Sequence, residues 1–240
     1  MKNVFITGST RGIGKQIGID LLKRDCLVYF NGHSRESIVE LDNELNSATN
    51  ANIISLDLST IENMNFVSSV FIERNISLDY LVLNLGVTNR TPFGEIIEED
   101  WNKVFETNLS APFFLIQALR NNINENGRII FISSLSGIVP DSVSISYGVS
   151  KAAINMLVPY LAKEFANKKI TVNAVAPGYI DNSWHKGKSI EQIKRIEQKC
   201  LAKRLGTVEE VSKVVLSIID NDYINGQIIQ INGGFGLCSQ

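Results

Sequence analysis

Ser134, Tyr147 and Lys151 are side chains that could together move a proton. Tyr147 and Lys151 lie four residues apart at the start of a predicted helix, so they share one face, one turn apart. An unperturbed tyrosine has a pKa of about 10, and a neighbouring ammonium group favours the phenolate and lowers that pKa. Ser134 ends a predicted strand, where its hydroxyl could bind a substrate carbonyl oxygen. The set predicts acid–base chemistry on a carbonyl or an alcohol, although each residue alone more often caps a helix, packs at a rim or carries surface charge.

A glycine-rich turn near residue 10 is a candidate phosphate site. It follows a predicted strand at 2–7 and precedes a helical pattern, in the spacing G-x-x-x-G-x-G. Glycines permit a tight turn and close approach of a pyrophosphate, and unpaired N–H groups at a helix start favour negative charge. A plain helix-entry loop is the alternative. We predict a dinucleotide site formed by Gly8, Ser9, Thr10, Arg11, Gly12, Ile13 and Gly14.

Two further strand ends bear on which dinucleotide binds. Asp57 and Leu58 follow the third predicted strand, within reach of an adenine amino group. An acid after the second strand would bind the ribose 2′-OH of NAD and repel the 2′-phosphate of NADP. That position carries His33 and Arg35 instead, and Arg11 lies in the glycine turn. The surrounding donors and positive charge predict NADP, with NAD as the alternative if these are simply exposed loop residues.

These residues need a scaffold that brings strand ends together. Short apolar runs alternate with longer amphipathic ones, which is typical of a parallel sheet with crossover helices. We predict an α/β fold: a doubly wound, Rossmann-type parallel seven-stranded sheet with helices on both faces, in a single domain over 1–240. The predicted strands are 2–7, 26–31, 51–56, 79–84, 127–133, 169–175 and 226–231, and the predicted helices are 12–24, 35–48, 60–75, 97–121, 146–166, 189–202 and 207–220.

The composition disfavours several classes of partner. The 240 residues carry a net charge of −2 with a pI near 5.8, which leaves no positive field to attract nucleic acid. No apolar run approaches the roughly 20 residues that span a bilayer, and the strand at 2–7 leaves no room for a signal peptide. Cys26, Cys200 and Cys238 are odd in number and lack metal-ligand spacing. We therefore expect free thiols, no metal site and a cytoplasmic location.

With these motifs assembled, the chain resembles the short-chain dehydrogenase/reductase family over nearly its whole length, and most of all its 3-oxoacyl-[acyl-carrier-protein] reductase-like branch. The resemblance rests on the glycine turn, Asn84-Leu85-Gly86, Asn108, Ser134, Tyr147, Lys151, Pro177-Gly178 and the segments 203–207 and 226–234. It implies that Ser134 orients the carbonyl, that Tyr147 exchanges the proton and that Lys151 binds the nicotinamide ribose while lowering the tyrosine pKa. Asn108 would hold a proton-relaying water.

The same resemblance assigns the cofactor walls. Asn84 and Gly86 would line the adenosine ribose and support the central strand. Ile180, which follows Pro177 and Gly178, would meet the nicotinamide carboxamide through its backbone. The cofactor would supply the hydride, and the protein would supply orientation and electrostatics.

Some positions depart from the family pattern. Leu85 replaces a small alanine beside the adenosine, and Asn182 stands where a threonine commonly touches the cofactor. Glu125, in the loop 124–127, is acidic where carrier-protein reductases often have a basic docking residue. Lys168, at the other docking position, is basic, so the evidence for carrier docking is divided.

The segment 179–202 is expected to form a lid over the substrate, with Trp184 and His185 as candidates for shape and polarity or for mere surface packing. The segment from Ile228 to Phe235 resembles the part that packs between subunits of tetramers in this family. We therefore expect a homo-oligomer, either a tetramer or a dimer.

Three functions remain open from the sequence. The first is an NADP(H)-dependent oxidoreductase that reduces a ketone to a secondary alcohol, with carrier-linked or thioester-linked 3-oxoacyl groups as the first substrate. The second is an NAD(P)-dependent dehydrogenase of a free small alcohol, polyol or sugar. The third is a catalytically inactive, cofactor-binding regulator, because a fold does not fix a function.

Overall fold

Seven parallel strands form one central sheet in this computed structural model, which describes residues 1–46, 48–140, 144–182 and 189–237. Their order across the sheet is β3-β2-β1-β4-β5-β6-β7, so the chain starts in the middle and winds outward in both directions. The predicted doubly wound fold is confirmed. The strands are β1 Asn3–Ile6, β2 Leu27–Gly32, β3 Ala51–Ser55, β4 Leu78–Leu83, β5 Ile123–Ile132, β6 Thr171–Pro177 and β7 Ile228–Ile231.

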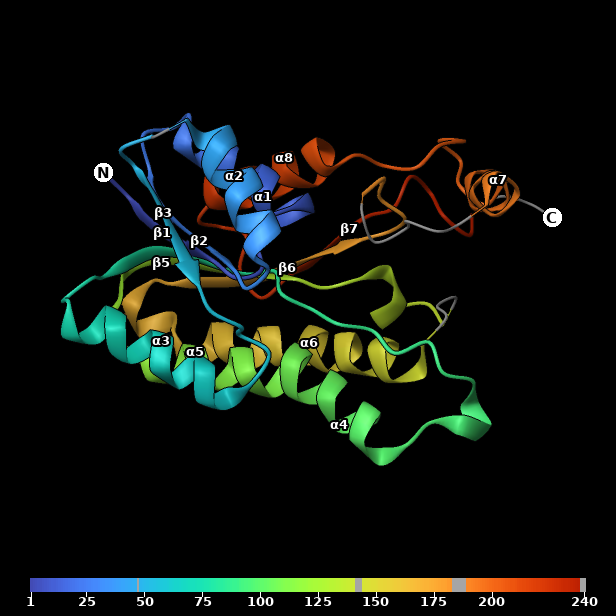
Figure 1. Cartoon of the computed structure of the whole chain (residues 1–240), viewed down its shortest axis with the longest axis horizontal. Coiled ribbons are helices and arrows are strands. Elements are labelled where there is room, and N and C mark those ends of the chain that lie inside the picture. Colours follow the sequence, from blue (N-terminus) through green and yellow to red (C-terminus); the bar gives the residue numbers. More distant parts are fainter. Residues whose placement is uncertain (47, 141–143, 183–188, 238–240) are drawn as a thin grey trace.

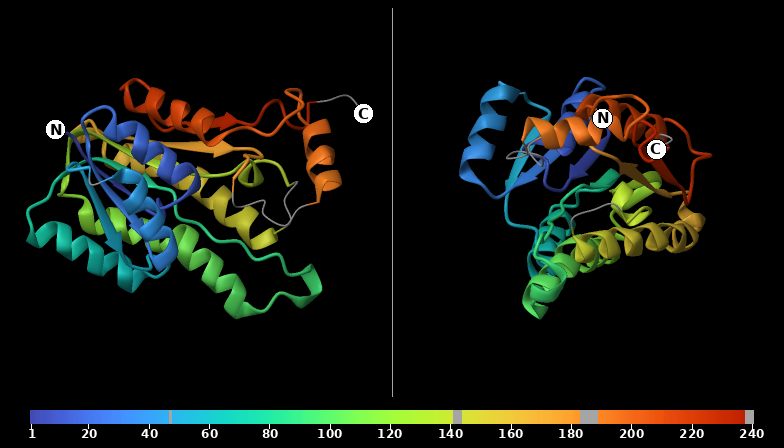
Figure 2. Two further views of the ribbon diagram at one scale, coloured as in Figure 1. Left: turned by 45° about the horizontal axis from the view of Figure 1, so that its top comes forward. Right: turned by 90° about the vertical axis from the view of Figure 1, so that its right-hand side faces the viewer.

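Helices cover both faces of the sheet (Figures 1 and 2). One layer contains α1 Gly12–Leu22, α2 Arg35–Leu45 and α8 Val208–Ile219, and the other contains α3 Ile61–Glu73, α5 Ala111–Leu119 and α6 Ile145–Glu164. The remaining helices are α4 Glu98–Phe105, which leads into α5, and α7 Ile190–Gln198. Short 3₁₀ turns lie at Phe93–Glu95, Leu135–Gly137 and Ala166–Lys168.

Successive residues along each strand contribute their side chains to two apolar cores, one on each face of the sheet. On β1, Phe5 packs with α3 and α5 residues in one core, whereas Val4 and Ile6 pack with α1 and α8 residues in the other. All three side chains are fully buried. Because successive strand side chains point to opposite faces, a continuously apolar strand requires cover on both sides. This is why unbroken apolar runs predicted the layered fold.

The predicted helix 97–121 is divided by a π-helical turn at Glu106–Ser110. The N–H of Ala111 bonds to the Glu106 carbonyl, five residues back, instead of four. Pro112, at the start of α5, has no N–H to donate to the Asn108 carbonyl, so an α-helical ladder cannot run through this point. The turn gives Asn108 a position that a regular helix would not give.

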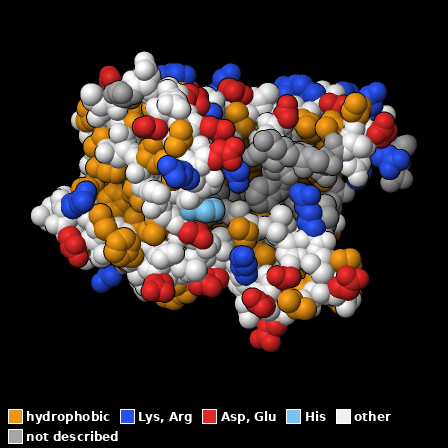
Figure 3. Space-filling view, viewed as in Figure 1, with side chains coloured by type: hydrophobic (Ala, Val, Ile, Leu, Met, Phe, Trp, Pro, Cys, Tyr) orange, Lys and Arg blue, Asp and Glu red, His pale blue; other side chains and the backbone are white. Residues whose placement is uncertain are grey.

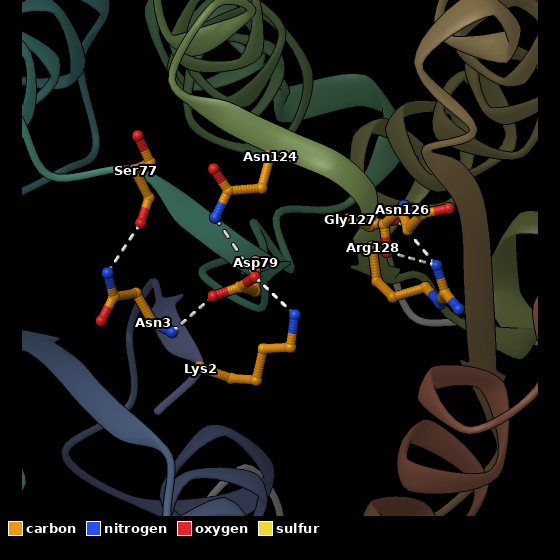
Figure 4. Close-up of polar contacts among 8 residues, drawn as sticks. All are labelled: Lys2, Asn3, Ser77, Asp79, Asn124, Asn126, Gly127 and Arg128. Atoms are coloured by element: carbon orange, nitrogen blue, oxygen red, sulfur yellow. Dashed lines mark hydrogen bonds and ion pairs between the residues drawn. The ribbon is translucent and has the colours of Figure 1, made fainter.

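Polar contacts fasten the amino-terminal edge of the sheet (Figure 4). Asp79, on β4, accepts hydrogen bonds from Lys2 Nζ (2.9 Å), the Asn3 N–H (2.8 Å) and Asn124 Nδ2 (3.2 Å). Burial raises the pKa of Asp79, but these donors outweigh it and the net pKa is lowered. Beside them, Arg128 Nη1 donates to the Asn126 carbonyl at 2.6 Å. Strand β5 begins at Ile123, before the predicted 127, because Ile123 already pairs with Leu78 of β4, ahead of a bulge.

The opposite, carboxyl-terminal edge gathers the predicted site residues. Adjacent strands β1 and β4 lead off to opposite sides of the sheet, and ligands of doubly wound folds bind at such a switch point. The chain leaves β1 into the glycine turn, β4 into Asn84, β5 into Ser133 and Ser134, and β6 into Gly178. Topology alone thus brings these four segments together.

Candidate active site

A cleft of about 420 Å³ lies over this edge and collects most of the predicted residues. It is bounded by the glycine turn, the residues at the ends of β2, β3, β4, β5 and β6, the Leu135–Gly137 turn and the start of α6. Of the predicted site residues, those that line it are Gly8, Thr10, Arg11, Gly12, Ile13, His33, Leu58, Asn84, Gly86, Ser134, Tyr147, Lys151, Pro177, Gly178 and Ile180. Ser9, Gly14, Asp57 and Asn108 are not part of its lining.

The glycine turn is shaped by close contacts with Asn84. Gly8 and Gly12 have φ values of +59° and +60°, a conformation that glycine adopts without strain. Asn84 Nδ2 donates to the Gly8 carbonyl at 2.8 Å, and a Cβ added at Gly14 would lie only 2.6 Å from that nitrogen. Gly14 therefore supports the turn from behind without touching the cleft.

The amino terminus of α1 opens onto the cleft. Its N-cap residue, Arg11, makes no side-chain capping bond, and no acid occupies the first turn. A Cβ at Gly12 would meet nothing within 4 Å, so this residue leaves space in the cleft. N–H groups at a helix start, a cationic side chain and open space fit a pyrophosphate group.

Asn31 is a site residue that the sequence prediction missed. It lies near the end of β2, is buried and lines the cleft, where its Oδ1 accepts from the Gly8 N–H at 2.9 Å. Its Nδ2 donates to the carbonyls of Ile54 and Leu56 on the next strand. Ser9 is buried and gives its N–H to the Asn31 carbonyl at 2.7 Å. An asparagine inside an otherwise apolar strand was the signal that could have identified it.

The residues after β2 that line the cleft are hydrogen-bond donors. His33 is exposed (pale blue in Figure 3), and Ser34 and Ser37 line the cleft beside it. Among the described residues that line the cleft, none is Asp or Glu. Arg35 is exposed and lies outside the lining. Asp57 is also exposed, and its Oδ1 accepts from the Ser59 N–H at 3.0 Å, which closes a local turn.

Ser134, Tyr147 and Lys151 converge in the cleft as predicted. The hydroxyls of Ser134 and Tyr147 are hydrogen-bonded to each other. Lys151 Nζ lies 5.6 Å from the centroid of the Tyr147 ring and donates to the Ile132 carbonyl at 2.8 Å. Ser144 caps α6 by accepting from the Tyr147 N–H at 3.3 Å, which fixes where the helix begins.

The electrostatics of the pair differ from the prediction. The sequence predicts that Lys151 lowers the pKa of Tyr147, but burial raises that pKa, and the Ser134 hydrogen bond opposes the rise. Burial also lowers the pKa of Lys151 to about 8. Both shifts have the same physical cause, since low-dielectric surroundings disfavour a phenolate and an ammonium alike. The spacing of two residues in a sequence does not report this burial.

Asn108 is near the catalytic residues but is occupied by structural bonds. Its Oδ1 accepts from the Val87 N–H (2.8 Å), and its Nδ2 donates to the Val87 carbonyl (3.0 Å) and to Ser150 Oγ (3.0 Å). Its side chain therefore clamps the loop after β4 to α6. Asn108 and Lys151 both border a narrow recess next to the cleft. The water-holding role of Asn108 stays a prediction.

The segment after β6 forms the remaining wall. Gly206 N–H donates to the Tyr179 carbonyl (2.9 Å), and Asp181 N–H donates to the Gly206 carbonyl (2.8 Å). Neither bond uses the N–H or C=O of Ile180, and the contact of its backbone with the nicotinamide stays a prediction. Asn182 also lines the cleft. Trp184 and His185 lie outside the described residues.

Comparison with known proteins identifies the family. The model of the short chain dehydrogenase family matches residues 2–193. The chain belongs to the short-chain dehydrogenase family. A hydroxynaphthalene reductase-like protein Arp2 from Metarhizium acridum is 33% identical, with 97% of this chain and 94% of that protein covered. The 3-oxoacyl-[acyl-carrier-protein] reductase FabG of Buchnera aphidicola is 31% identical, with 97% and 96% covered.

Solved structures agree with this assignment. The Pseudomonas aeruginosa RhlG/NADP active-site complex matches with a TM-score of 0.90 at 27% identity, over 98% of this chain and 96% of that one. As a short-chain dehydrogenase whose relatives are named reductases, the chain is an NAD(P)-dependent oxidoreductase. The predicted resemblance to this family and to its 3-oxoacyl reductases is confirmed.

Proposed function

We propose that this short-chain dehydrogenase reduces a ketone to a secondary alcohol with NADPH, and that Tyr147 supplies the proton. The observation that carries the proposal is the hydrogen-bonded pair of Ser134 and Tyr147, with Lys151 beside the ring, in a cleft whose described lining has cations but no carboxylate. Burial raises the pKa of Tyr147, so the phenol is protonated at neutral pH, which is the form that reduction requires.

The roles of the residues follow from this geometry. The Ser134 hydroxyl donates a hydrogen bond to the substrate carbonyl oxygen and orients it toward the phenol. The Tyr147 hydroxyl gives its proton to that oxygen as the alcohol forms. Lys151 provides a positive charge that stabilises the phenolate left behind. When bound, the dinucleotide supplies the hydride to the carbonyl carbon, so one hydride and one proton complete the alcohol.

NADP is favoured over NAD by charge. Arg11 and His33 line the end of the cleft nearest β2, together with the hydroxyls of Ser34 and Ser37. A 2′-phosphate brings about two negative charges, which these donors can meet and an acid would repel. We expect NADPH to bind at least tenfold more tightly than NADH in a fluorescence titration, and His33→Asp to reduce or reverse that preference. Equal affinities in the unmodified chain would contradict the proposal for NADP.

The substrate is proposed as a 3-oxoacyl thioester, with a free small ketone as the second candidate. The named activity of FabG relatives supports the first. The second is favoured by the docking positions: Glu125 is acidic and exposed, and Lys168 Nζ already donates to the Arg120 carbonyl at 2.8 Å. Both lie at the amino-terminal edge of the sheet, opposite the cleft.

Turnover of an acetoacetyl thioester, compared with a panel of free ketones and free alcohols, tests the substrate assignment. NADPH oxidation with the thioester at a higher kcat/KM than with any free ketone is the expected result. A higher kcat/KM for a free ketone would select the second candidate. A polyol or sugar oxidised with NAD in preference to both would overturn ketone reduction as the function.

Several wider features belong to the same proposal. We propose that 179–202, which contains α7, forms a lid and that the chain assembles as a homo-oligomer through the region of β7, whose isoleucines are partly exposed. Sedimentation showing only monomer at micromolar concentration would contradict assembly. Cys26 and Cys200 are buried, and a cytoplasmic location is part of the proposal. No helix in the described part of the chain combines the length and apolar character needed to cross a membrane.

A further inference from the structure

The side-chain amide of Asn155 bridges α6 to both ends of the turn that carries Ser134. Ser133 Oγ donates to Asn155 Oδ1 at 2.6 Å, immediately before Ser134 in the chain. Asn155 Nδ2 donates to the Gly137 carbonyl at 3.2 Å, at the end of the same turn. One amide therefore holds the entry and the exit of the segment 133–137.

The position of Asn155 on α6 relates it directly to the catalytic residues. Tyr147, Lys151 and Asn155 are spaced four residues apart, so they follow one another along one face of the helix. Ser133 Oγ also lies 3.4 Å from the Lys151 carbonyl. The turn is pressed against this face, because a Cβ added at Gly137 would lie 2.6 Å from the Lys151 carbonyl carbon.

The Ser134 hydroxyl depends on this arrangement. Ser134 itself caps the short turn by accepting from the Ser136 N–H at 3.1 Å, and the Gly137 N–H bonds to the Ser134 carbonyl at 3.0 Å. These bonds fix Ser134 within its own turn. They do not fix the turn against α6, where Tyr147 lies. The two bonds through Asn155 join both ends of the turn to a side chain of that helix.

We infer that Asn155 is a positioning residue, which holds the turn 133–137 against α6 and so keeps the Ser134 hydroxyl in contact with the Tyr147 hydroxyl. This inference rests on the proposed function and deepens it. The hydrogen bond from Ser134 opposes the rise in the pKa of Tyr147 that burial causes. Loosening the turn therefore raises that pKa further and also misaligns the carbonyl-orienting hydroxyl.

The test compares Asn155→Ala with the unmodified chain on a ketone that the latter reduces. We expect kcat to fall about tenfold or more, while the Kd for NADPH changes less than about twofold, because the glycine turn is untouched. The pH profile of alcohol oxidation should move its midpoint to higher pH. In the protein without ligand, NMR of isotope-labelled tyrosine should show the Tyr147 phenol titrating at higher pH, with Tyr147→Phe identifying the signal.

Asn124→Ala is the matched control. Asn124 also donates one side-chain bond from a partly buried amide, to Asp79, but at the opposite end of the sheet. It should lower thermal stability to a similar extent without changing kcat or the pH profile. A double-mutant cycle adds Ser133→Ala, which removes the donor to Asn155. The effects of the two substitutions on kcat should be less than additive, because both remove the same Ser133–Asn155 hydrogen bond.

Two results would overturn the inference. One is an Asn155→Ala protein whose kcat and pH profile match the unmodified chain. The other is a loss of activity that tracks only the fraction of folded protein, with the Tyr147 titration unchanged. If the unmodified chain reduces no ketone, the proposed function fails instead, and the tyrosine titration in the ligand-free protein still decides whether Asn155 positions Ser134.

Discussion

Tyr147 experiences opposing influences from its neighbours: burial raises its pKa, and the hydrogen bond with Ser134 lowers it. Substitution by phenylalanine removes the Tyr147 hydroxyl with little change in volume.

Tyr147→Phe should retain NADPH binding and lose on the order of 10²-fold or more in turnover, because general acid catalysis contributes that much. Steady-state kinetics and a fluorescence titration measure the two effects. Tyr160→Phe, an exposed position on the same helix, is the control, and unchanged turnover in Tyr147→Phe would end its assignment.

Lys151 gives a prediction for stability against pH. Its pKa is lowered from 10.5 to about 8 in the folded protein. The folded state thus binds fewer protons than the unfolded state between these values, and stability rises with pH across that window. The burial of the ammonium costs about 3 kcal/mol below pH 8, from about 1.4 kcal/mol for each pH unit.

Lys151→Met removes that cost together with the bond to the Ile132 carbonyl, so it should be inactive yet more stable at pH 7 by about 2 kcal/mol. Urea denaturation from pH 7 to 10.5 should show the difference from the unmodified chain shrinking as the pH rises through 8. Lys163→Met, at an exposed position of α6, should stay within about 0.5 kcal/mol. A difference that is constant with pH would contradict a lowered Lys151 pKa.

At the level of single residues, the sequence predicts those site residues whose amino-acid types and spacing form a specific motif. The catalytic trio and most of the glycine turn could be predicted because their types and spacing are specific. The contact of Asp57 with the adenine stays a prediction, since its carboxylate bonds to the nearby Ser59 N–H and does not line the cleft. Asn31 and Asn155 were missed for the converse reason, because each acts through long-range hydrogen bonds that no short motif contains.

At the level of elements, the glycine turn and the start of α1 pack closely against Asn84, which follows β4. Gly14 is helical, so its identity is required by packing: a methyl group there would lie 2.6 Å from Asn84 Nδ2 and 3.0 Å from the Ser9 backbone. Gly14→Ala should destabilise the fold by about 1–3 kcal/mol and weaken NADPH binding as the turn shifts. Thermal unfolding and a binding titration would show both. Gly94→Ala, where nothing lies within 4 Å, should change neither, and an equally neutral Gly14→Ala would contradict the supporting role of Asn84.

Element positions follow closely from apolar periodicity, and the exceptions have local causes. The pattern over 97–121 continues through the π turn, so periodicity predicts one helix. Pro112 was the available signal that the backbone ladder breaks there. The early start of β5 depends on a bulge at which Asn126 adopts a positive φ of 60°. A bulge is an irregularity in the pairing of two strands. The apolar pattern of one strand does not show which strand it pairs with, so the pattern does not predict the bulge.

For the whole molecule, the order of the strands decides where chemistry occurs. Parallel strands that wind outward from β1 and β4 bring their carboxyl ends to one edge, and residues that follow six of them line the cleft there. This arrangement was predictable from alternating elements, because crossovers between parallel strands are right-handed. The depth of the cleft, and with it the pKa values of Tyr147 and Lys151, depends on side-chain packing across the entire chain. That information is spread over too many residues for a motif to carry.

A crystal structure of the chain with NADPH and a ketone tests the central claim most directly. We predict the pyrophosphate at the glycine turn, the 2′-phosphate near His33 and the nicotinamide beside Tyr147, with the ketone oxygen in hydrogen-bond reach of both Ser134 and Tyr147. A dinucleotide bound with its nicotinamide away from Tyr147, or a ketone oxygen that contacts neither hydroxyl, would contradict the account.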